Sequence, residues 1–404
     1  MISRLRPTLG FAELRAALSW NQHHQDVQRF EKAFAKLAGQ HQSVAFPYGR
    51  TGLLAILQTL GLHGREIICP AYTCVVVPHA IVTSGNRPVF LDTYPQGMNM
   101  DLGLVDQAIT KGTGAIIATS VFGQPADLDA LDVIRSTHPE IPIIQDCAHS
   151  FFCEWNGRPV HKAGLCAVYG LNISKIMTSI FGGIVTTDDS DFASALRAQR
   201  EQILSPATIL KSIKRLLYLI SVYPAFTPTI YGLINRMERS GLLDKFVKYY
   251  DPGIIDMPED YLQAMTPLEA RVGTIQCYRY PDIVAHRRKL AQIYFGELAG
   301  IPELRLPPRD TGATYSHFVI RTPAATYLRD YCLDRGIQLG NLIDYHIPDM
   351  AAYSDAVHIG VGNARQLPEQ VINLPVHTGC STYQAKRLAR TIKNSLRNLA
   401  SQQI

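Results

Sequence analysis

Short, continuously apolar runs alternate with segments of helical periodicity along residues 42–189. The runs predict strands at residues 43–49, 65–70, 87–92, 114–123, 141–150, 163–172 and 182–189, and the segments between them predict helices at residues 50–62, 74–85, 102–112 and 127–139. Because the runs are apolar throughout instead of alternating, both faces of their sheet are expected to be buried. This order predicts an α/β fold: a large three-layer domain with a mostly parallel central sheet between helices.

Residues 204–255 break this pattern. The segment is rich in Leu, Ile and Tyr, and Lys and Arg flank its apolar parts. One interpretation is a helical insertion that covers the body of the protein or a dimer partner. The other is an amphipathic element on a membrane surface. Pro224 and Pro228 are expected to divide the segment into two short helices, which favours lying on a surface over spanning a bilayer.

The remainder of the chain reads as a mixture of helices and strands. A long helical stretch at residues 267–300 leads to a strand at 315–322, a helix at 324–336 and a basic terminal helix. We therefore predict three parts, which are a large domain at residues 1–203, a hydrophobic and basic helical insertion at 204–255, and a small C-terminal α+β domain at 256–404.

Composition and charge narrow the class of protein. Of 404 residues, 47% are hydrophobic and 18% are charged, with a net charge of +5, which is typical of a globular chain. The eight cysteines form no C-x-x-C pair, and the N-terminal stretch lacks the apolar core of a signal peptide. Free thiols in a reducing cytoplasm are the simplest account. Neither a metal site nor nucleic-acid binding is predicted.

Candidate functional groups fall at the ends of the predicted strands. Gly49-Arg50-Thr51 follows the first strand and opens a helix, Asp146 and His149 follow the strand that begins at residue 141, and Lys175 lies between two later strands. Sheets of this kind bind ligands at the carboxyl ends of their strands. The convergence of these distant groups therefore predicts a site there.

The chemistry of these groups suits one cofactor. Pyridoxal phosphate (PLP) requires a lysine that forms a Schiff base, an acid that keeps the pyridine nitrogen protonated, and a place for its phosphate. A glycine turn at a helix N-terminus supplies the last of these. Gly49-Arg50-Thr51, Asp146 and Lys175 offer all three in order. A lysine beside a glycine turn is otherwise usually a surface residue, and an aspartate after a strand is otherwise a helix cap.

Six stretches in order resemble motifs of the DegT/StrS sugar-nucleotide aminotransferases, which are fold-type I PLP enzymes. YGRTGLLAIL resembles the phosphate turn of the family, and QDCAHS resembles its Glu-Asp-Ala-Ala-Gln/His-Ala. SKIMTSIFGGIVTTDD keeps the family spacing from the lysine to the double glycine. The other three stretches are CPAYTCVVVPHAIVTSGNRPVFLD, VFGQPADLDAL and LPVHTGCS. The resemblance runs from about residue 30 to the C-terminal helix, except for residues 204–255.

The resemblance assigns roles residue by residue. Lys175 would be the Schiff-base lysine and proton shuttle, and Asp146 would pair with the pyridine nitrogen. His149 would hydrogen-bond the ring hydroxyl. Gly49, Arg50, Thr51 and Ser174 would belong to the cofactor-binding set, with Arg50 and Thr51 on the phosphate. His377 and Tyr345 are candidates to line the substrate site, with a structural role as the alternative.

Three positions depart from the family pattern. Gly170 replaces a phosphate-binding serine, Cys74 replaces a stacking aromatic, and Leu262 replaces an asparagine that reaches the cofactor of the partner subunit. Arg50 is unusual in the phosphate turn and is expected to compensate, because guanidinium binds phosphate through two hydrogen bonds.

The resemblance implies a PLP-dependent aminotransferase. Its substrate would be a keto-sugar nucleotide, its amino donor glutamate, and its product an amino sugar for a surface polysaccharide or glycoconjugate. A cytoplasmic homodimer is implied, with possible contact at the inner membrane surface through residues 204–255 as the open alternative above. Two competing functions remain. One is a non-catalytic or regulatory member of the fold, and the other is a PLP-dependent sugar dehydratase, a class in which histidine replaces the lysine.

Overall fold

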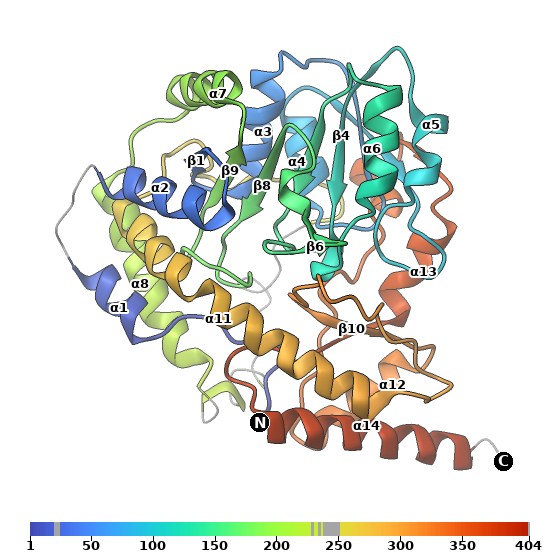
Figure 1. The fold of residues 1–404 in the computed structure, drawn as a ribbon. Coiled ribbons are helices and arrows are strands. Elements are labelled where there is room, and N and C mark those ends of the chain that lie inside the picture. Colours follow the sequence, from blue (N-terminus) through green and yellow to red (C-terminus); the bar gives the residue numbers. More distant parts are fainter. Residues whose placement is uncertain (20–24, 228–229, 233–235, 237–250, 403–404) are drawn as a thin grey trace.

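The computed structural model describes residues 1–19, 25–227, 230–232, 236 and 251–402 (Figure 1). Its centre is one eight-stranded sheet with the strand order β1-β9-β8-β5-β4-β2-β3-β11. In this sheet β9 runs antiparallel to β1 and β8, and the other neighbouring pairs are parallel. The strands are β1 (Gln42–Phe46), β2 (Glu66–Pro70), β3 (Arg87–Leu91), β4 (Thr113–Thr119), β5 (Ile143–Asp146), β8 (Cys166–Gly170), β9 (Gly183–Thr187) and β11 (Val357–Ile359).

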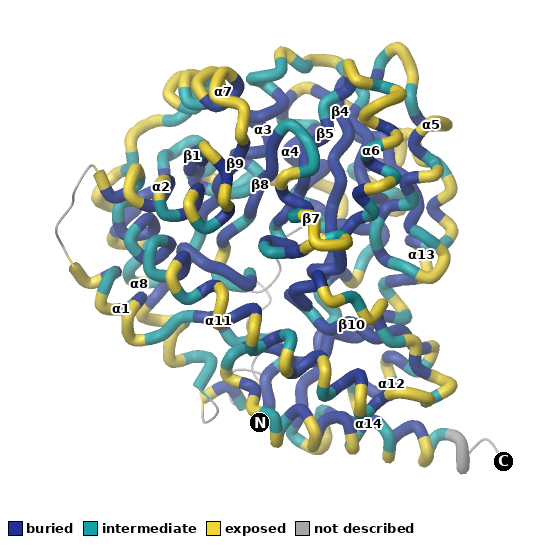
Figure 2. The backbone as a smooth tube through the Cα atoms, viewed as in Figure 1, coloured by how far each residue is buried: buried dark blue, intermediate teal, exposed yellow. Residues whose placement is uncertain are grey.

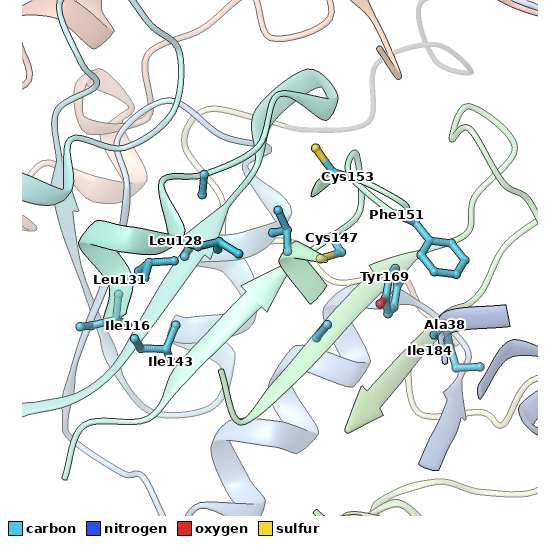
Figure 3. Packing of buried hydrophobic residues seen from close by; sticks show 14 of the residues in the cluster. Ala38, Ile116, Leu128, Leu131, Ile143, Cys147, Phe151, Cys153, Tyr169 and Ile184 are labelled. Atoms are coloured by element: carbon cyan, nitrogen blue, oxygen red, sulfur yellow. The ribbon is translucent and has the colours of Figure 1, made fainter. Parts of the chain in front are cut away.

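Helices cover both faces of this sheet, which confirms the predicted three-layer α/β fold. Strand β4 is buried along its whole length, as expected of a strand with helices above and below it. Figure 3 shows the apolar side chains of one layer, in which Ile116 and Ile143 from neighbouring strands pack against Leu128 and Leu131. One face packs against α2 (Asp26–Ala38), α5 (Val105–Ala108), α6 (Leu128–Thr137) and α11 (Pro267–Leu298). The other face packs against α3 (Gly49–Thr59), α4 (Val76–Thr83), α7 (Ser190–Ile203) and α13 (Gly362–Gln370).

The predicted helix at residues 102–112 is shorter in the structure. A 3₁₀ turn, η1 (Leu102–Leu104), leads into α5, which ends at Ala108. The chain is extended at Ile109, and the Thr110 N–H donates to Thr113 Oγ1 at 2.9 Å instead of to a helical carbonyl. Local side-chain bonding of this kind competes with the helix.

A small hairpin beyond β5 was not predicted. Strands β6 (Glu154–Trp155) and β7 (Arg158–Pro159) pair in antiparallel fashion across Asn156 and Gly157, whose φ values are 50° and 77°. Asn-Gly is a strong turn signal because both residues adopt positive φ at low cost. The sequence therefore contained the information needed to find this hairpin.

The C-terminal region forms a second core beneath the large sheet (Figure 1). Helix α11 links the two, because residues 270–284 share a core with α2 and residues 290–298 share the second core with α14. The region contains β10 (Phe318–Arg321) paired antiparallel with β12 (Val371–Leu374), together with α12 (Ala325–Leu333) and α14 (Thr382–Gln402). Strand β11 pairs instead with β3 at the edge of the large sheet. The division at residues 203 and 255 stays a prediction. Short 3₁₀ turns are η2 (Val121–Gly123), η3 (Val160–Lys162), η4 (Ile347–Asp349) and η5 (Ala351–Tyr353).

Helix α8 (Ile209–Ala225) is the described part of the segment at residues 204–255, and it lies beside α1 (Phe11–Leu18) and α11. Helix α8 ends at Ala225, one residue after Pro224, and the chain is helical again at residues 230–232, so a break falls at the first of the two prolines, as expected. Pro228 lies outside the described residues. Among the helices that the structure describes, none is both long and apolar enough to cross a bilayer.

Candidate active site

Asp146 ends strand β5, and Thr119 ends the neighbouring strand β4 at the paired register position. Thr119 Oγ1 donates to one carboxylate oxygen of Asp146 at 3.3 Å, and the Ala148 N–H donates to the other at 3.0 Å. Burial raises the pKa of Asp146, while these hydrogen bonds and the charge of Lys175 oppose the rise. The site therefore holds a buried carboxylate whose ionised form a nearby cation would stabilise.

Lys175 lies in the loop that joins β8 to β9. Its N–H donates to Asn172 O at 3.0 Å, which closes a tight turn. Ser174 donates to Asn172 Oδ1 through its N–H at 3.0 Å and its hydroxyl at 2.6 Å. The Ser174 side chain therefore supports the turn that presents Lys175, and it is Asn172 that it contacts.

His149 contacts the lysine directly. Its Nε2 lies 2.9 Å from Lys175 Nζ, and its Nδ1 lies 3.4 Å from the Phe122 N–H. The imidazole stacks on the Phe122 ring at a centroid distance of 5.8 Å and an interplanar angle of 10°. Burial, followed by the charge of Lys175, holds the pKa of His149 well below its usual value. Asp146 and His149 are buried and Lys175 is half-buried, and the three form one cluster at the strand ends.

Two members of this cluster were missed by sequence reasoning. Phe122 has φ of 57°, a left-handed conformation that is rare outside glycine and that no local pattern reveals. His317 precedes β10 in the C-terminal region, and its ring centroid lies 5.4 Å from that of His149 and 5.6 Å from that of Phe122. Burial lowers the pKa of His317 to about 3, so a neutral imidazole faces the cluster.

The predicted phosphate turn lies at the N-terminus of α3. The first backbone hydrogen bond of this helix runs from Gly52 N to Tyr48 O, so the N–H groups of Arg50 and Thr51 precede it at the positive end of the helix dipole. A Cβ on Gly49 would lie 2.9 Å from Gly170 Cα, which explains the need for glycine there. Since a Cβ on Gly170 would in turn lie 3.7 Å from Lys175 Cε, the turn and the lysine are neighbours.

Residues 256–261 hold the turn from outside. One Arg50 guanidinium nitrogen donates to Asp256 O at 3.2 Å, and Thr51 Oγ1 donates to Tyr261 O at 3.0 Å. Burial lowers the pKa of Arg50, and Cys74 is first among the nearby groups that oppose this. The side chains of Arg50 and Thr51 therefore both bond to backbone carbonyls of the segment 256–261.

The two candidates for the substrate site lie in different surroundings. The Tyr345 hydroxyl accepts the N–H of Val75, the neighbour of Cys74, at 2.9 Å, which places it beside the turn. His377 Nε2 instead bonds Ser3 O at 3.0 Å. Only Tyr345 is therefore near the other site residues by its contacts.

Helix α8 reaches the turn through Tyr48. Arg215 donates to the Tyr48 hydroxyl at 2.8 Å and to Asp260 at 2.6 Å, and the Tyr48 hydroxyl donates to Asp260 at 2.5 Å. Arg215 Nε also donates to the fully buried Glu269 at 3.0 Å. The inserted helix is thus fastened to the residue that precedes the phosphate turn.

The site residues fit PLP. The buried Asp146 carboxylate has hydrogen-bond donors but no ion pair with any described residue, and a protonated pyridine nitrogen would complete it. An anion would meet the N–H groups and arginine at the α3 N-terminus. A Cβ on Gly170 would meet Ala148 and Lys175 at 3.7 Å, so this departure from the family leaves room for a larger group. No cluster of three or more metal-ligating side chains occurs in the part of the chain that the structure describes.

The eight-stranded sheet, the helical layers on its two faces and the lysine beside its strand ends define a fold-type I aminotransferase fold. Residues 11–213 and 244–393 match the model of the DegT/DnrJ/EryC1/StrS aminotransferase family, and the chain belongs to this family. This confirms the resemblance drawn from the sequence motifs.

Known relatives cover parts of the chain. A GDP-perosamine synthase from Caulobacter vibrioides is 31% identical over 45% of this chain and 48% of its own length. A UDP-4-amino-4-deoxy-L-arabinose–oxoglutarate aminotransferase from Shewanella sediminis is 33% identical over 41% of this chain and 43% of its own length. The chain thus spans less than half the length of these two relatives. The crystal structure of the aminotransferase TlmJ from Streptoalloteichus hindustanus superposes with a TM-score of 0.78 at 22% identity, covering 99% of this chain and 100% of that one.

Proposed function

We propose that this protein is a PLP-dependent aminotransferase that transfers an amino group to a keto-sugar nucleotide. The observation that carries the proposal is the cluster of Lys175, His149 and Asp146 at the strand ends, next to the glycine turn of α3. When bound, PLP supplies an aldehyde for the amine and a ring that accepts electrons as a bond to the reacting carbon breaks.

The residues of this chain have separate tasks in the proposal. Lys175 Nζ takes a proton from the α-carbon of the amino donor and later returns one to the sugar carbon. His149 holds the amine in place. Asp146 keeps the ring nitrogen protonated by its negative charge, and Arg50 and Thr51 bind the phosphate at the α3 N-terminus.

The names of the relatives support the substrate class and the donor. Both curated relatives are named for amino sugars on nucleotides, and the Shewanella protein is named for oxoglutarate. Because 2-oxoglutarate is the keto acid of glutamate, glutamate is the proposed donor. An amino sugar for a surface polysaccharide or glycoconjugate is the proposed product.

Assembly and location are further parts of the proposal. Family resemblance supports a two-fold homodimer. The free cysteines of the described residues support a reducing cytoplasm. Peripheral contact with the inner membrane surface would be made through residues 204–255.

The test is a spectrum and a turnover assay on the purified protein with added PLP. We expect a visible band from the lysine adduct, loss of that band on adding glutamate, and recovery on adding a 4-keto sugar nucleotide. A band that glutamate does not change would indicate a non-catalytic member of the fold. Formation of a deoxy sugar without transfer of nitrogen would indicate a dehydratase.

A further inference from the structure

Helix α8 turns Lys211 and Arg215 toward the body of the protein and exposes a row of apolar side chains to solvent. Lys211 is 4% exposed, and its ammonium contacts Gln263 O at 2.7 Å and Asp260 at 3.2 Å. Arg215 is bound to Asp260 and Glu269. Leu216 and Leu219 accompany these cations and pack on the small core shared with α1 and α11. The inner face of α8 is therefore fully engaged with the body of the protein.

The outer face of α8 carries large apolar side chains. On a helix, these positions fall on one side because successive residues are about 100° apart. The exposed set, called here the α8 outer face, is Ile209 (60%), Leu210 (61%), Ile213 (39%), Leu217 (58%), Ile220 (47%) and Tyr223 (37%). Figure 2 shows exposed and half-buried stretches along α8 and the neighbouring α1 at one edge of the molecule. On α1, Phe11 and Leu18 are also 75% and 54% exposed. A cluster of this size on a protein surface marks a contact with another apolar phase.

The charge around the α8 outer face indicates which apolar partner it contacts. Between Glu201 and Glu238 the chain has four basic residues and no acidic residue. Lys211 and Arg215 are paired with inward-facing carboxylates, which leaves Lys214 and Arg236 exposed. Lys214 is exposed and borders the α8 outer face. A second copy would meet this face through a two-fold axis, which sets the same face against itself and brings like charges together. An anionic lipid surface complements both the apolar side chains and the positive charge.

We propose that α8 is an interfacial helix that binds the protein to anionic membranes. Its outer face enters the boundary between headgroups and acyl chains, while Lys214 stays among the lipid phosphates. The helix has 17 residues, which is shorter than the roughly 20 needed to span a bilayer. It therefore lies in the plane of the surface.

Helix α8 is also connected to the candidate active site. Arg215 on the inner face binds Tyr48, which precedes the phosphate turn. A membrane below α8 thus holds the site at a fixed distance from the lipid surface, where a membrane-bound enzyme can receive the product. The binding itself does not depend on the proposed catalytic activity.

The test is co-sedimentation of the full-length protein with vesicles. One set contains phosphatidylcholine alone and the other contains phosphatidylcholine mixed with phosphatidylglycerol. We expect binding to the anionic vesicles at low salt, weakened by salt. The triple variant Ile213→Ser, Leu217→Ser, Ile220→Ser should lose at least about tenfold in partitioning, because each apolar side chain contributes to insertion. Lys214→Glu should weaken binding to the anionic set alone.

Val133→Ser is the matched control, because Val133 on α6 is 64% exposed and lies apart from α8. It should bind as the unaltered protein does. Circular dichroism and the PLP spectrum should be unchanged in all variants, since the substituted side chains face outward. Failure of the unaltered protein to sediment with either set overturns the proposal. So does a triple variant that binds normally, or one that instead converts a dimer to a monomer in light scattering.

Discussion

Lys175 Nζ and His149 Nε2 lie 2.9 Å apart, and the far nitrogen of the same imidazole faces the Phe122 N–H. That N–H donates toward the imidazole, so the backbone of a left-handed residue helps to fix how His149 faces Lys175.

Replacing the lysine should abolish transfer without unfolding the protein. Lys175→Ala removes the covalent catalyst, and we expect a loss of turnover of at least about a thousandfold. Lys162→Ala is the control, because Lys162 binds Gly39 O at the surface. Amino transfer measured at saturating PLP gives the answer, and a Lys175→Ala protein with more than about a tenth of normal turnover contradicts the assignment.

Replacing the histidine should reduce turnover less than replacing the lysine. His149→Ala leaves the amine without its partner, and misplacement of a reacting group costs about 100-fold. His149→Gln retains a hydrogen-bonding group for the amine and should recover part of the loss. If His149→Ala and His149→Gln have equal turnover while both keep the PLP absorbance band, His149 does not position Lys175.

Replacing Asp146 should separate catalysis from stability. Asp146→Asn is expected to lower turnover far more than PLP affinity, because an amide does not hold the ring nitrogen protonated. In the cofactor-free protein burial raises the pKa of Asp146 above its unfolded value, so the stability that this group contributes is full below the unfolded pKa and falls as pH rises through the folded pKa.

Asn has no such titration, so the cofactor-free variant should gain stability over the unaltered protein near neutral pH. The gain should vanish as the pH falls towards about 4. Denaturant unfolding at both pH values, without PLP, measures it. A pH-independent difference would show that Asp146 is not the group that titrates.

Two glycines that face each other should respond differently to the same change. A Cβ on Gly49 meets backbone at 2.9 Å, whereas a Cβ on Gly170 meets only side-chain atoms at 3.7 Å. Gly49→Ala is expected to cost about 1–3 kcal/mol of unfolding free energy and to weaken PLP binding. Gly170→Ala and Gly170→Ser should be near neutral. Similar melting temperatures for all three variants would count against the close approach.

Arg215 should matter far more than a surface arginine. Arg215→Ala leaves Glu269, which is fully buried, without its cation, and such losses cost about 3–5 kcal/mol. Arg29→Ala is the control, because Arg29 is 60% exposed in its pair with Asp26 and should cost at most about 1 kcal/mol. Urea unfolding compares the two, and PLP titration should show weaker binding only for the Arg215 variant.

His377 should limit stability in acid. Burial lowers its pKa to about 4, below the unfolded value, so its contribution is lost as the pH falls through that window. At about pH 5 the loss in free energy of unfolding reaches about 2 kcal/mol. The free energy of unfolding of His377→Gln, relative to that of the unaltered protein, should therefore rise by about 2 kcal/mol from about pH 8 to about pH 5. A difference between the two proteins that is the same at both pH values would refute this.

The sequence by itself determined the sheet and the candidate residues at the ends of its strands. Strands β1 to β5 follow from continuous apolar runs, because burial on both faces requires them. Asp146, Lys175 and Gly49 were recognisable because the chemistry of each depends on its place at a strand end. The family motifs suggested a role for each of these residues, which stays a prediction, and the matching family model confirms the resemblance.

Tertiary structure alone decided which distant groups meet. His317 joins His149 from the C-terminal region, and Phe122 adopts a left-handed conformation that its side chain does not favour. Neither leaves a local pattern, because sequence periodicity records only which face of an element is buried. The same limit hid the arrangement of α8, whose composition showed only that it has apolar and basic residues. The positions of Asp260 and Glu269 determined that Lys211 and Arg215 face inward, which leaves the apolar side chains of the α8 outer face toward solvent.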